Sequence, residues 1–235
     1  MTRISIRITI AMIFMMVLCL TSYGQGTDAY ALGVKGHVKR VITQTYTASQ
    51  AGDHLVKGQP VDEGEEVMTF DRDGRVTLDP FGNQYSYDER GRFVRGTEPY
   101  SRMSRDEDGR IDTYEHMRDD EDVEGFGMEC AYDEQGRLIE TAIQFWEWSH
   151  NYQYTYEDDH VYPEREAFEF REYENVTRVT RDFRYTKFDD RGNWTEREVH
   201  VVSIDIEEPD DEDTPPRVGE PATTYEVEMR TITYY

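Results

Sequence analysis

The sequence predicts an all-β protein, an antiparallel meander of hairpin repeats forming a curved, twisted sheet, with partial closure of that sheet left open as an alternative. Three observations predict it. Aromatic residues make up 13% of the 235 residues, including 17 Tyr and 10 Phe, and aromatic and β-branched residues favour strands. One turn-like motif recurs with glycine at a fixed position. Beyond residue 24, no segment shows the 3.6-residue apolar period of an amphipathic helix.

Residues 1–24 are expected to be a signal peptide. Two arginines precede the apolar run 8–20, and small residues end at Gly24, where a signal peptidase would cut. The run is shorter than the roughly 20 residues of a spanning helix, and Cys19 lacks the preceding small residue expected of a lipoprotein. We therefore expect export to the periplasm, the cell surface or the medium, cleavage before Gln25, and no membrane span in the mature chain.

The remaining residues, 25–235, are expected to form a single all-β repeat domain. A first strand is expected ahead of the repeats. The polar stretch 49–64 contains three glycines and a proline, which predicts a linker between this strand and the repeats. Residues 25–30 and 207–218 are expected to be poorly ordered.

The hairpin repeats share one motif: an aromatic residue, Asp, two polar residues, Gly, and then Arg or Asn. The Asp side chain can accept hydrogen bonds from the following backbone, and Gly supplies the positive φ that closes the hairpin loop. The first motif glycines are 17 and 18 residues apart, which corresponds to one hairpin per repeat. Four clear and two degenerate copies lie at 70–75, 87–92, 132–137 and 188–193 and at 104–110 and 156–160.

The last two strand-like runs, 193–206 and 222–235, predict a closing hairpin. Between them lies the acidic, proline-rich segment 207–216. Its composition favours a solvated loop over a segment that binds cations or a partner.

The repeated turns resemble those of the bacterial YD-repeat, or RHS-like, proteins. The stretch Phe188–Glu196 is most similar to that family, and Leu32–Val41 resembles the first strand of its small exported members in Bacteroidetes-type bacteria. The resemblance covers residues 30–205. It implies an exported β-repeat architecture without assigning an activity, and the chain is too short for the shell with which larger members enclose toxins.

Charge and motif content exclude several functions. With 26 Lys and Arg against 50 Asp and Glu, the net charge is −24, which argues against a nucleic-acid partner. The sequence contains no G-x-S-x-G, H-E-x-x-H or Walker motif. We therefore expect a non-enzymatic protein, with calcium as the only cofactor that the sequence suggests.

The calcium hypothesis rests on one loop. Counted from Ser104, the EF-hand ligand positions 3, 5, 9 and 12 hold Asp106, Asp108, Asp112 and Glu115. Against it, position 1 is Ser, the preceding residues do not predict a helix, and a degenerate hairpin repeat falls here. A structural turn is favoured over a loose calcium site.

An aromatic cluster is the candidate binding surface. Trp146 and Trp148 are followed, after a short polar stretch, by Tyr152 and Tyr154, and their alternation predicts rows of rings on which a sugar or peptide could stack. The alternative, which we favour, is that these rings form the core of a thin sheet.

The leading functional hypothesis is therefore an exported β-repeat protein that binds a glycan or a protein partner at the cell envelope. One alternative is an outer-membrane β-barrel, but both alternating faces of the run 176–183 carry an arginine, whereas a barrel needs an apolar lipid face. Another is an exported carboxylate-dependent hydrolase, which the abundance of acidic residues permits but does not select.

Overall fold

A computed structural model describes residues 27–97, 100–117, 126–145, 147–209 and 215–235. The prediction of an all-β protein is confirmed. The signal-peptide prediction for residues 1–24 lies outside the described residues. None of the described helices is long and apolar enough to cross a membrane.

The described elements are one helical turn and fifteen strands. In chain order they are α2 (Asp28–Ala31), β1 (Val38–Ala51), β2 (His54–Phe70), β3 (Val76–Leu78), β4 (Ser86–Tyr87), β5 (Phe93–Arg95), β6 (Tyr100–Arg105), β7 (Ile111–Met117), β8 (Phe126–Tyr132), β9 (Leu138–Gln144), β10 (Trp148–Thr155), β11 (Arg165–Glu172), β12 (Asn175–Phe188), β13 (Trp194–Glu207), β14 (Arg217–Val218) and β15 (Ala222–Tyr234).

Most strands belong to one antiparallel sheet of 13 strands. Its order is β3-β2-β1-β15-β13-β12-β11-β10-β9-β8-β7-β6, with β14 paired to β13 and a separate β4–β5 hairpin. The meander is confirmed from β6 to β13, and the predicted closing hairpin is confirmed by the pairing of β13 with β15. The described sheet ends at β3 and β6 and does not close, so the alternative of partial closure is wrong.

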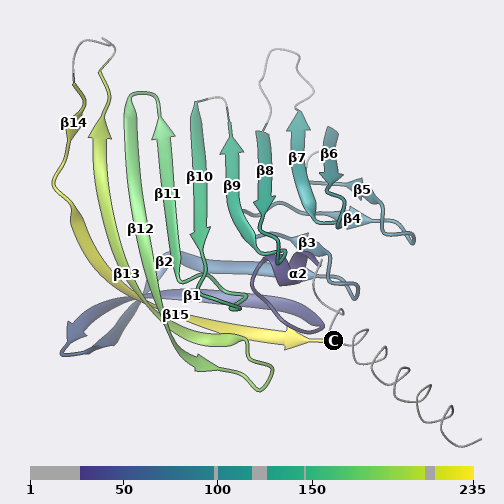
Figure 1. Ribbon diagram of the computed structural model, residues 1–235, viewed down its shortest axis with the longest axis horizontal. Helices are drawn as coiled ribbons and strands as arrows, with labels where there is room; N and C mark the ends of the chain where they lie inside the picture. Colours follow the sequence, from purple (N-terminus) through teal and green to yellow (C-terminus); the bar gives the residue numbers. More distant parts are fainter. Residues whose placement is uncertain (1–26, 98–99, 118–125, 146, 210–214) are drawn as a thin grey trace, which may run out of the picture.

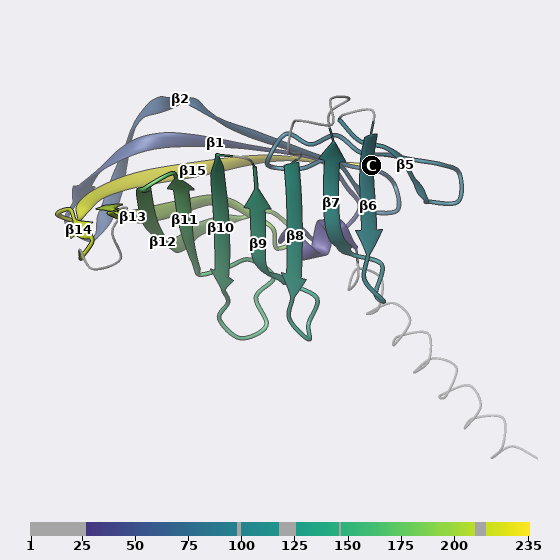
Figure 2. The same ribbon diagram turned by 90° about the horizontal axis from the view of Figure 1, so that it is seen from above.

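The sheet twists until one part lies over another. In Figure 1, β6 to β13 stand side by side while β1, β2 and β15 cross them, and Figure 2 shows the crossing strands running behind this row. A long sheet of right-handed twist curls in this way. The concave face holds the main core, in which Val41 and Met68 belong to the same cluster as Tyr114 and Met128.

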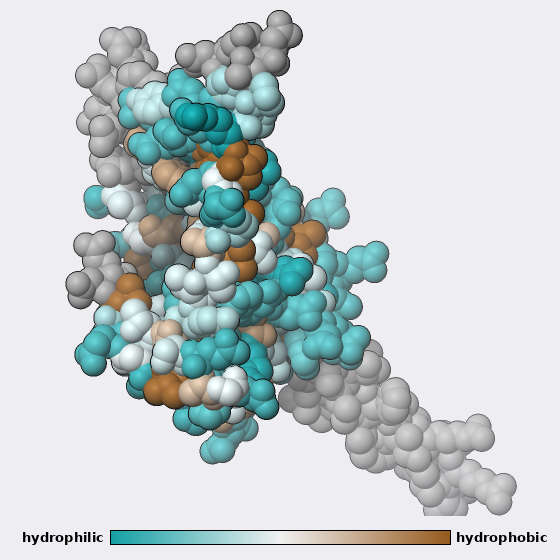
Figure 3. Space-filling model, turned by 90° about the vertical axis from the view of Figure 1, so that its left-hand side faces the viewer, coloured by the Kyte–Doolittle hydropathy of each residue, from teal (hydrophilic) through white to brown (hydrophobic). Residues whose placement is uncertain are grey.

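The surface seen from the side that carries β14 is largely polar, in keeping with the charge of the chain, and its hydrophobic patches are small and separate (Figure 3). Along β10, exposed Asn151 and Gln153 alternate with half-buried Tyr152 and Tyr154, as a sheet with one solvated face requires.

The prediction of a linker at 49–64 is wrong. Most of this segment belongs to the long β1–β2 hairpin, where Ala51 pairs with His54 and Gly52 takes a φ of 66° at the turn. The residues are polar because this end of the hairpin is largely exposed, so they gave no alternating pattern. Residues 27–30 were also expected to be poorly ordered, but Thr27 accepts a hydrogen bond from the Tyr30 backbone at the start of α2.

Five hairpin turns that carry the predicted motif share one geometry, and we call them the Asp-Gly turns. Residues 79–83 form a further turn of the same geometry, which was not predicted from the sequence. In each of the five, the Asp N–H donates to the carbonyl of the residue four positions on, and the Asp carbonyl accepts a hydrogen bond from the Gly N–H. One carboxylate oxygen of the Asp side chain accepts hydrogen bonds from the N–H groups two and four residues on. The turn glycine has a φ between 76° and 85°, as the sequence predicted. The five turns span 71–75, 88–92, 106–110, 133–137 and 189–193.

Consecutive turns are also bonded to one another. The arginine that ends one turn lies over the tyrosine of a following repeat, and that tyrosine donates its hydroxyl to the carbonyl after the arginine. Arg110 lies 4.6 Å from the centre of the Tyr132 ring, whose hydroxyl is 2.7 Å from the Ile111 carbonyl. The same arrangement joins Arg75 to Tyr87 and Arg137 to Tyr156. The motif therefore encodes a contact between repeats as well as a turn.

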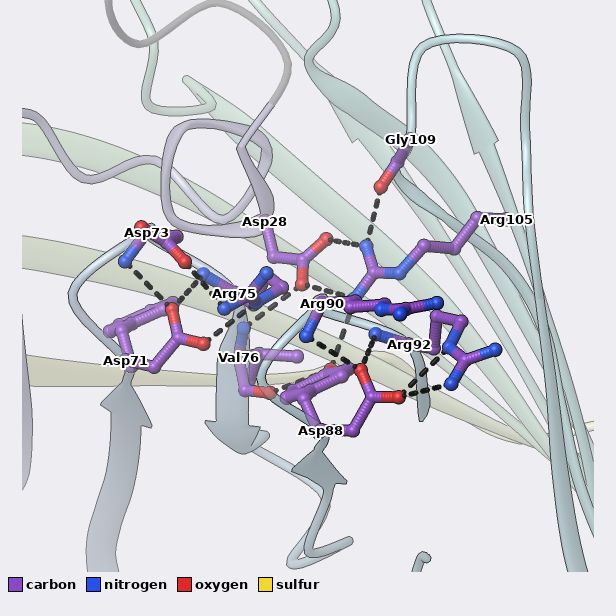
Figure 4. A network of polar contacts seen from close by, with 12 residues as sticks. Asp28, Asp71, Asp73, Arg75, Val76, Asp88, Arg90, Arg92, Arg105 and Gly109 are labelled. Carbon is purple, nitrogen blue, oxygen red and sulfur yellow. Dashed lines mark hydrogen bonds and ion pairs between the residues drawn. The ribbon is translucent and has the colours of Figure 1, made fainter. Parts of the chain in front are cut away.

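The N-terminal helix is attached to the first turns by a buried carboxylate (Figure 4). Asp28 accepts hydrogen bonds from the Val76 backbone at 2.9 Å and from both terminal nitrogens of Arg105 at 2.9 and 3.0 Å. Arg105 also donates to the Tyr87 hydroxyl at 3.0 Å. This network fixes α2 and the following segment against one end of the concave face.

Candidate functional site

The concave face contains a cavity of about 360 Å³. Its floor is formed by residues of β2, of β9 to β13 and of β15. Its cover comes from segments 31–33 and 80–81, and the loop at 162–163 also lines it. This volume is within the range of small-molecule sites, about 300–1,000 Å³. Seven aromatic side chains line it together with five charged ones, which are Glu66, Glu166, Arg181, Arg197 and Arg230.

Strand register brings these charges to one face. Glu66 of β2 and Arg230 of β15 are both paired with Thr43 of β1, so the three form one row across three strands. Arg197 of β13 pairs with Glu228 of β15 in a second row. Residues directly opposite in a sheet share a face, which is why a charge cluster forms from distant segments.

A second part of the cluster comes from the neighbouring strands. Arg181 of β12 pairs with Glu166 of β11, which in turn pairs with Tyr154 of β10. The charges of β11 and β12 thus continue directly into the aromatic row of β10.

Two of the three arginines are neutralised by ion pairs. Arg181 lies 3.3 Å from Glu166 and 3.1 Å from Glu226 and also contacts Glu228. Arg197 lies 2.6 Å from Glu228, which is only 3% exposed. Burial by itself would raise the pKa of Glu228, but the charges of Arg197 and Arg181 outweigh it and lower that pKa to about 2. Glu228 is therefore ionised and balances these arginines.

Arg230 has no such counter-ion among the described residues. Its Nε donates to the Thr43 hydroxyl at 3.2 Å, and its guanidinium carbon lies 3.7 Å from the centre of the Trp194 ring. Burial, and then the charge of Arg197, lower the pKa of Arg230 to about 9. The guanidinium thus lines the cavity with both terminal nitrogens unused by any described carboxylate.

Glu66 is the second group without a described hydrogen bond or ion pair. Its side chain is accessible through the cavity. Desolvation of the carboxyl by the surrounding protein raises its pKa, and the negative charge of Glu228 raises it further. The cavity thus offers one cation and one carboxylate that the described residues leave unpaired. A ligand that supplies both an acceptor and a donor would complement them.

The predicted aromatic residues that the structure describes all lie on one face of β10, next to both the cavity and the main core. Tyr152 and Tyr154 line the cavity, and Tyr152 stacks on Phe168 with ring centres 5.4 Å apart. Trp148 lies on the same face of β10 but packs in the core, where it stacks on Phe145 at 5.2 Å. Trp146 lies outside the described residues. The row follows one strand, β10, and the neighbouring rings come from β11.

The residues of the calcium hypothesis do not converge in the described structure. Asp106 and Asp108 belong to an Asp-Gly turn, and the Arg110 guanidinium lies between them, 2.6 Å from Asp106 and 2.8 Å from Asp108. Asp112 and Glu115 lie farther along β7. Across the described ranges, no group of three or more His, Cys, Asp or Glu side chains is placed to hold a metal ion. Calcium binding stays a prediction, to which the geometry adds no support.

Sequence reasoning missed the charged lining of the cavity. A signal was present: Glu226, Glu228 and Arg230 alternate along one face of β15, which is the face that a half-buried strand would fill with apolar residues. Without the order of the strands, however, their partners Arg181 and Arg197 could not be assigned.

A scan against protein-family models and searches of curated proteins and of solved structures gave no match to this chain. The resemblance to YD-repeat proteins therefore stays a prediction, and function has to be argued from the site.

Proposed function

We propose that this protein is an exported, non-enzymatic binding protein that holds part of a glycan in the cavity of its concave face. The observation that carries the proposal is the coexistence of aromatic rings and unpaired polar groups in one cavity of ligand size. Sugars present an apolar C–H face, which stacks on aromatic rings, and hydroxyl groups, which need polar partners.

Several contacts hold the cavity wall in place before any ligand arrives. Trp194 is 1% exposed, and Arg197 and Arg230 both lie over its ring, at 4.4 and 3.7 Å from its centre. Tyr152 is held between Phe168 and Phe81. A wall that is already ordered loses little conformational entropy on binding, which supports a binding role.

A carboxylate-dependent hydrolase is the second candidate, and one observation favours it. The raised pKa of Glu66 is what a general acid requires, and a second carboxylate, Glu166, lines the same cavity. Glu166 forms an ion pair with Arg181, which argues against a free catalytic carboxylate at this position. Release of reducing sugar that Glu66→Gln abolishes would select the hydrolase.

The test of the binding proposal is a glycan array probed with the purified protein, followed by calorimetric titration of the best glycan. Replacing the cavity ring in Tyr152→Ala should weaken binding about tenfold, or roughly 1.4 kcal/mol, through lost stacking. The matched control is Tyr173→Asn, which removes a ring that is 60% exposed and lies outside the cavity, at a position with positive φ that Asn tolerates.

Two results would contradict the proposal. One is that no glycan on the array binds while a single protein is recovered from envelope extract. This result would indicate a protein partner instead. The other is glycan binding that Tyr152→Ala leaves unchanged, which would place the site elsewhere. Repeating the array with and without calcium also tests the loop at 104–115.

A further inference from the structure

Arg230 is unlike the other two arginines of the cavity. Arg181 and Arg197 each contact at least one carboxylate, whereas Arg230 has only the neutral Thr43 hydroxyl and the Trp194 ring among the described residues. Placing a charge away from bulk water without a counter-ion is unfavourable. Its neighbour Arg197 adds a second positive charge to the same wall, and the low pKa of Arg230 reflects both effects.

We propose that Arg230 recognises a carboxylate and that the bound glycan is therefore acidic, with a uronic acid residue in the cavity. This inference rests on the proposed function. The carboxylate accepts hydrogen bonds from the terminal nitrogens of Arg230, a hydroxyl of the same sugar donates to Glu66, and the sugar ring contacts the aromatic wall.

A carboxylate satisfies Arg230 better than a hydroxyl does. The planar guanidinium can donate two parallel hydrogen bonds to it, and charge-assisted hydrogen bonds are about twice as strong as neutral ones. Two carboxylates nearby would repel the ligand. Glu228 lies two residues from Arg230 on β15, but its charge is taken up by its ion pairs with Arg181 and Arg197. Glu66 is the other, because it carries negative charge when ionised. It lies two strands away from Arg230, roughly 10 Å along the sheet at the usual strand spacing, so the attraction of the directly bonded arginine dominates.

The location of Arg230 in the cavity also explains how a chain of net charge −24 could bind an acidic sugar selectively. Such a chain repels anions over most of its surface. An acidic sugar would bind only where cations line a partly desolvated wall, because electrostatic attraction there is least screened. Among the described residues of the cavity wall, Arg230 meets that requirement, because it is the arginine there that no described carboxylate contacts.

The experiment compares acidic and neutral sugars of the same linkage. Calorimetric titrations use disaccharides of galacturonate, glucuronate and mannuronate and the matching disaccharides of galactose, glucose and mannose, with the unmodified protein, Arg230→Gln and Arg230→Lys. The control is Arg178→Gln, which removes an arginine from an exposed pair with Glu169 on the other face of the sheet. Melting curves establish that each variant is folded.

We expect at least one uronate disaccharide to bind tenfold or more tightly than its neutral counterpart. Arg230→Gln should abolish that preference, Arg230→Lys should retain part of it, and Arg178→Gln should retain all of it. Equal binding of acidic and neutral sugars, or a preference that survives in Arg230→Gln, overturns the inference and leaves the proposed function standing. Failure of both series to bind overturns the proposed function and the inference with it. If Arg230→Gln does not fold, an acidic preference unchanged in Arg230→Lys counts against the inference.

Discussion

At the scale of single residues, Arg197 and Arg230 show how position determines what an arginine does. Both lie over Trp194, but only Arg197 is paired with the buried Glu228. Removing Arg197 leaves a buried carboxylate with less than its full counter-charge. Removing Arg230 takes away a cation that no described carboxylate contacts.

The first prediction compares these two arginines by unfolding in urea. Because one partner of a buried ion pair is lost, Arg197→Gln should lower the free energy of unfolding by about 3–5 kcal/mol. Arg230→Gln should change it by less than about 1 kcal/mol, since the lost cation–π contact is offset by relief of an unbalanced charge. If both variants lowered the free energy of unfolding equally, Arg230 would be a residue that stabilises the fold, which would contradict a role in binding a ligand.

The second prediction concerns acid. The pKa of Glu228 is about 2 in the folded protein against an ordinary value of 4.5, so the unfolded chain takes up a proton first as the pH falls. The stabilisation from this group is complete above pH 4.5 and is lost as the pH falls from 4.5 towards 2. Unfolding free energies measured across this interval should fall less steeply in Glu228→Gln than in the unmodified protein. Parallel slopes would mean that other carboxylates govern acid unfolding.

At the scale of elements, the Asp-Gly turns are the units that the sequence specifies most directly. Each depends on an Asp, a Gly and an Arg or Asn within five residues, so their hydrogen bonds are local and can be read from the motif. The inter-turn contact from Arg110 to Tyr132 then aligns neighbouring hairpins.

The third prediction isolates the backbone requirement of these turns. Gly109 has a φ of 85° with no atom within 4 Å of an added Cβ, and Gly127 lies in β8 with equally open space but without positive φ. Gly109→Ala should lower the free energy of unfolding by about 1–2 kcal/mol, the cost of a left-handed conformation for alanine. Gly127→Ala should have little effect or stabilise slightly. Thermal unfolding of both variants provides the measurement, and equal effects would rule out a conformational origin.

Whether an element could be predicted from the sequence depends on whether its signal is local in the chain. The turns and the β13–β15 hairpin could be predicted because their signals are local. The insertion of β15 between β13 and β1 could not, because it depends on pairing between segments far apart in the chain. The stretch 49–64 was misassigned because exposed strand ends carry polar residues, which are also typical of linkers. For the cavity, Tyr152 and Tyr154 could be predicted as aromatic strand residues, whereas the arginines depend on register across the sheet.

At the scale of the whole molecule, the curl of the sheet creates both the core and the cavity. Strands β1, β2 and β15 cross behind β7 to β10 (Figure 2), and the covering segments 31–33 and 80–81 fill only part of the space that this leaves. The remaining volume is lined by groups from seven strands, from both covering segments and from the loop at 162–163. A function located there depends on the complete fold and not on any single repeat.

The central claim is that the concave cavity is the binding site, and a crystal structure of the protein with the glycan selected on the array tests it most directly. The account predicts the sugar inside the cavity, with an acidic group on Arg230 and a ring face against Tyr152. A glycan bound on the outer face of the sheet, or along the edge strands β3 or β6, would contradict it.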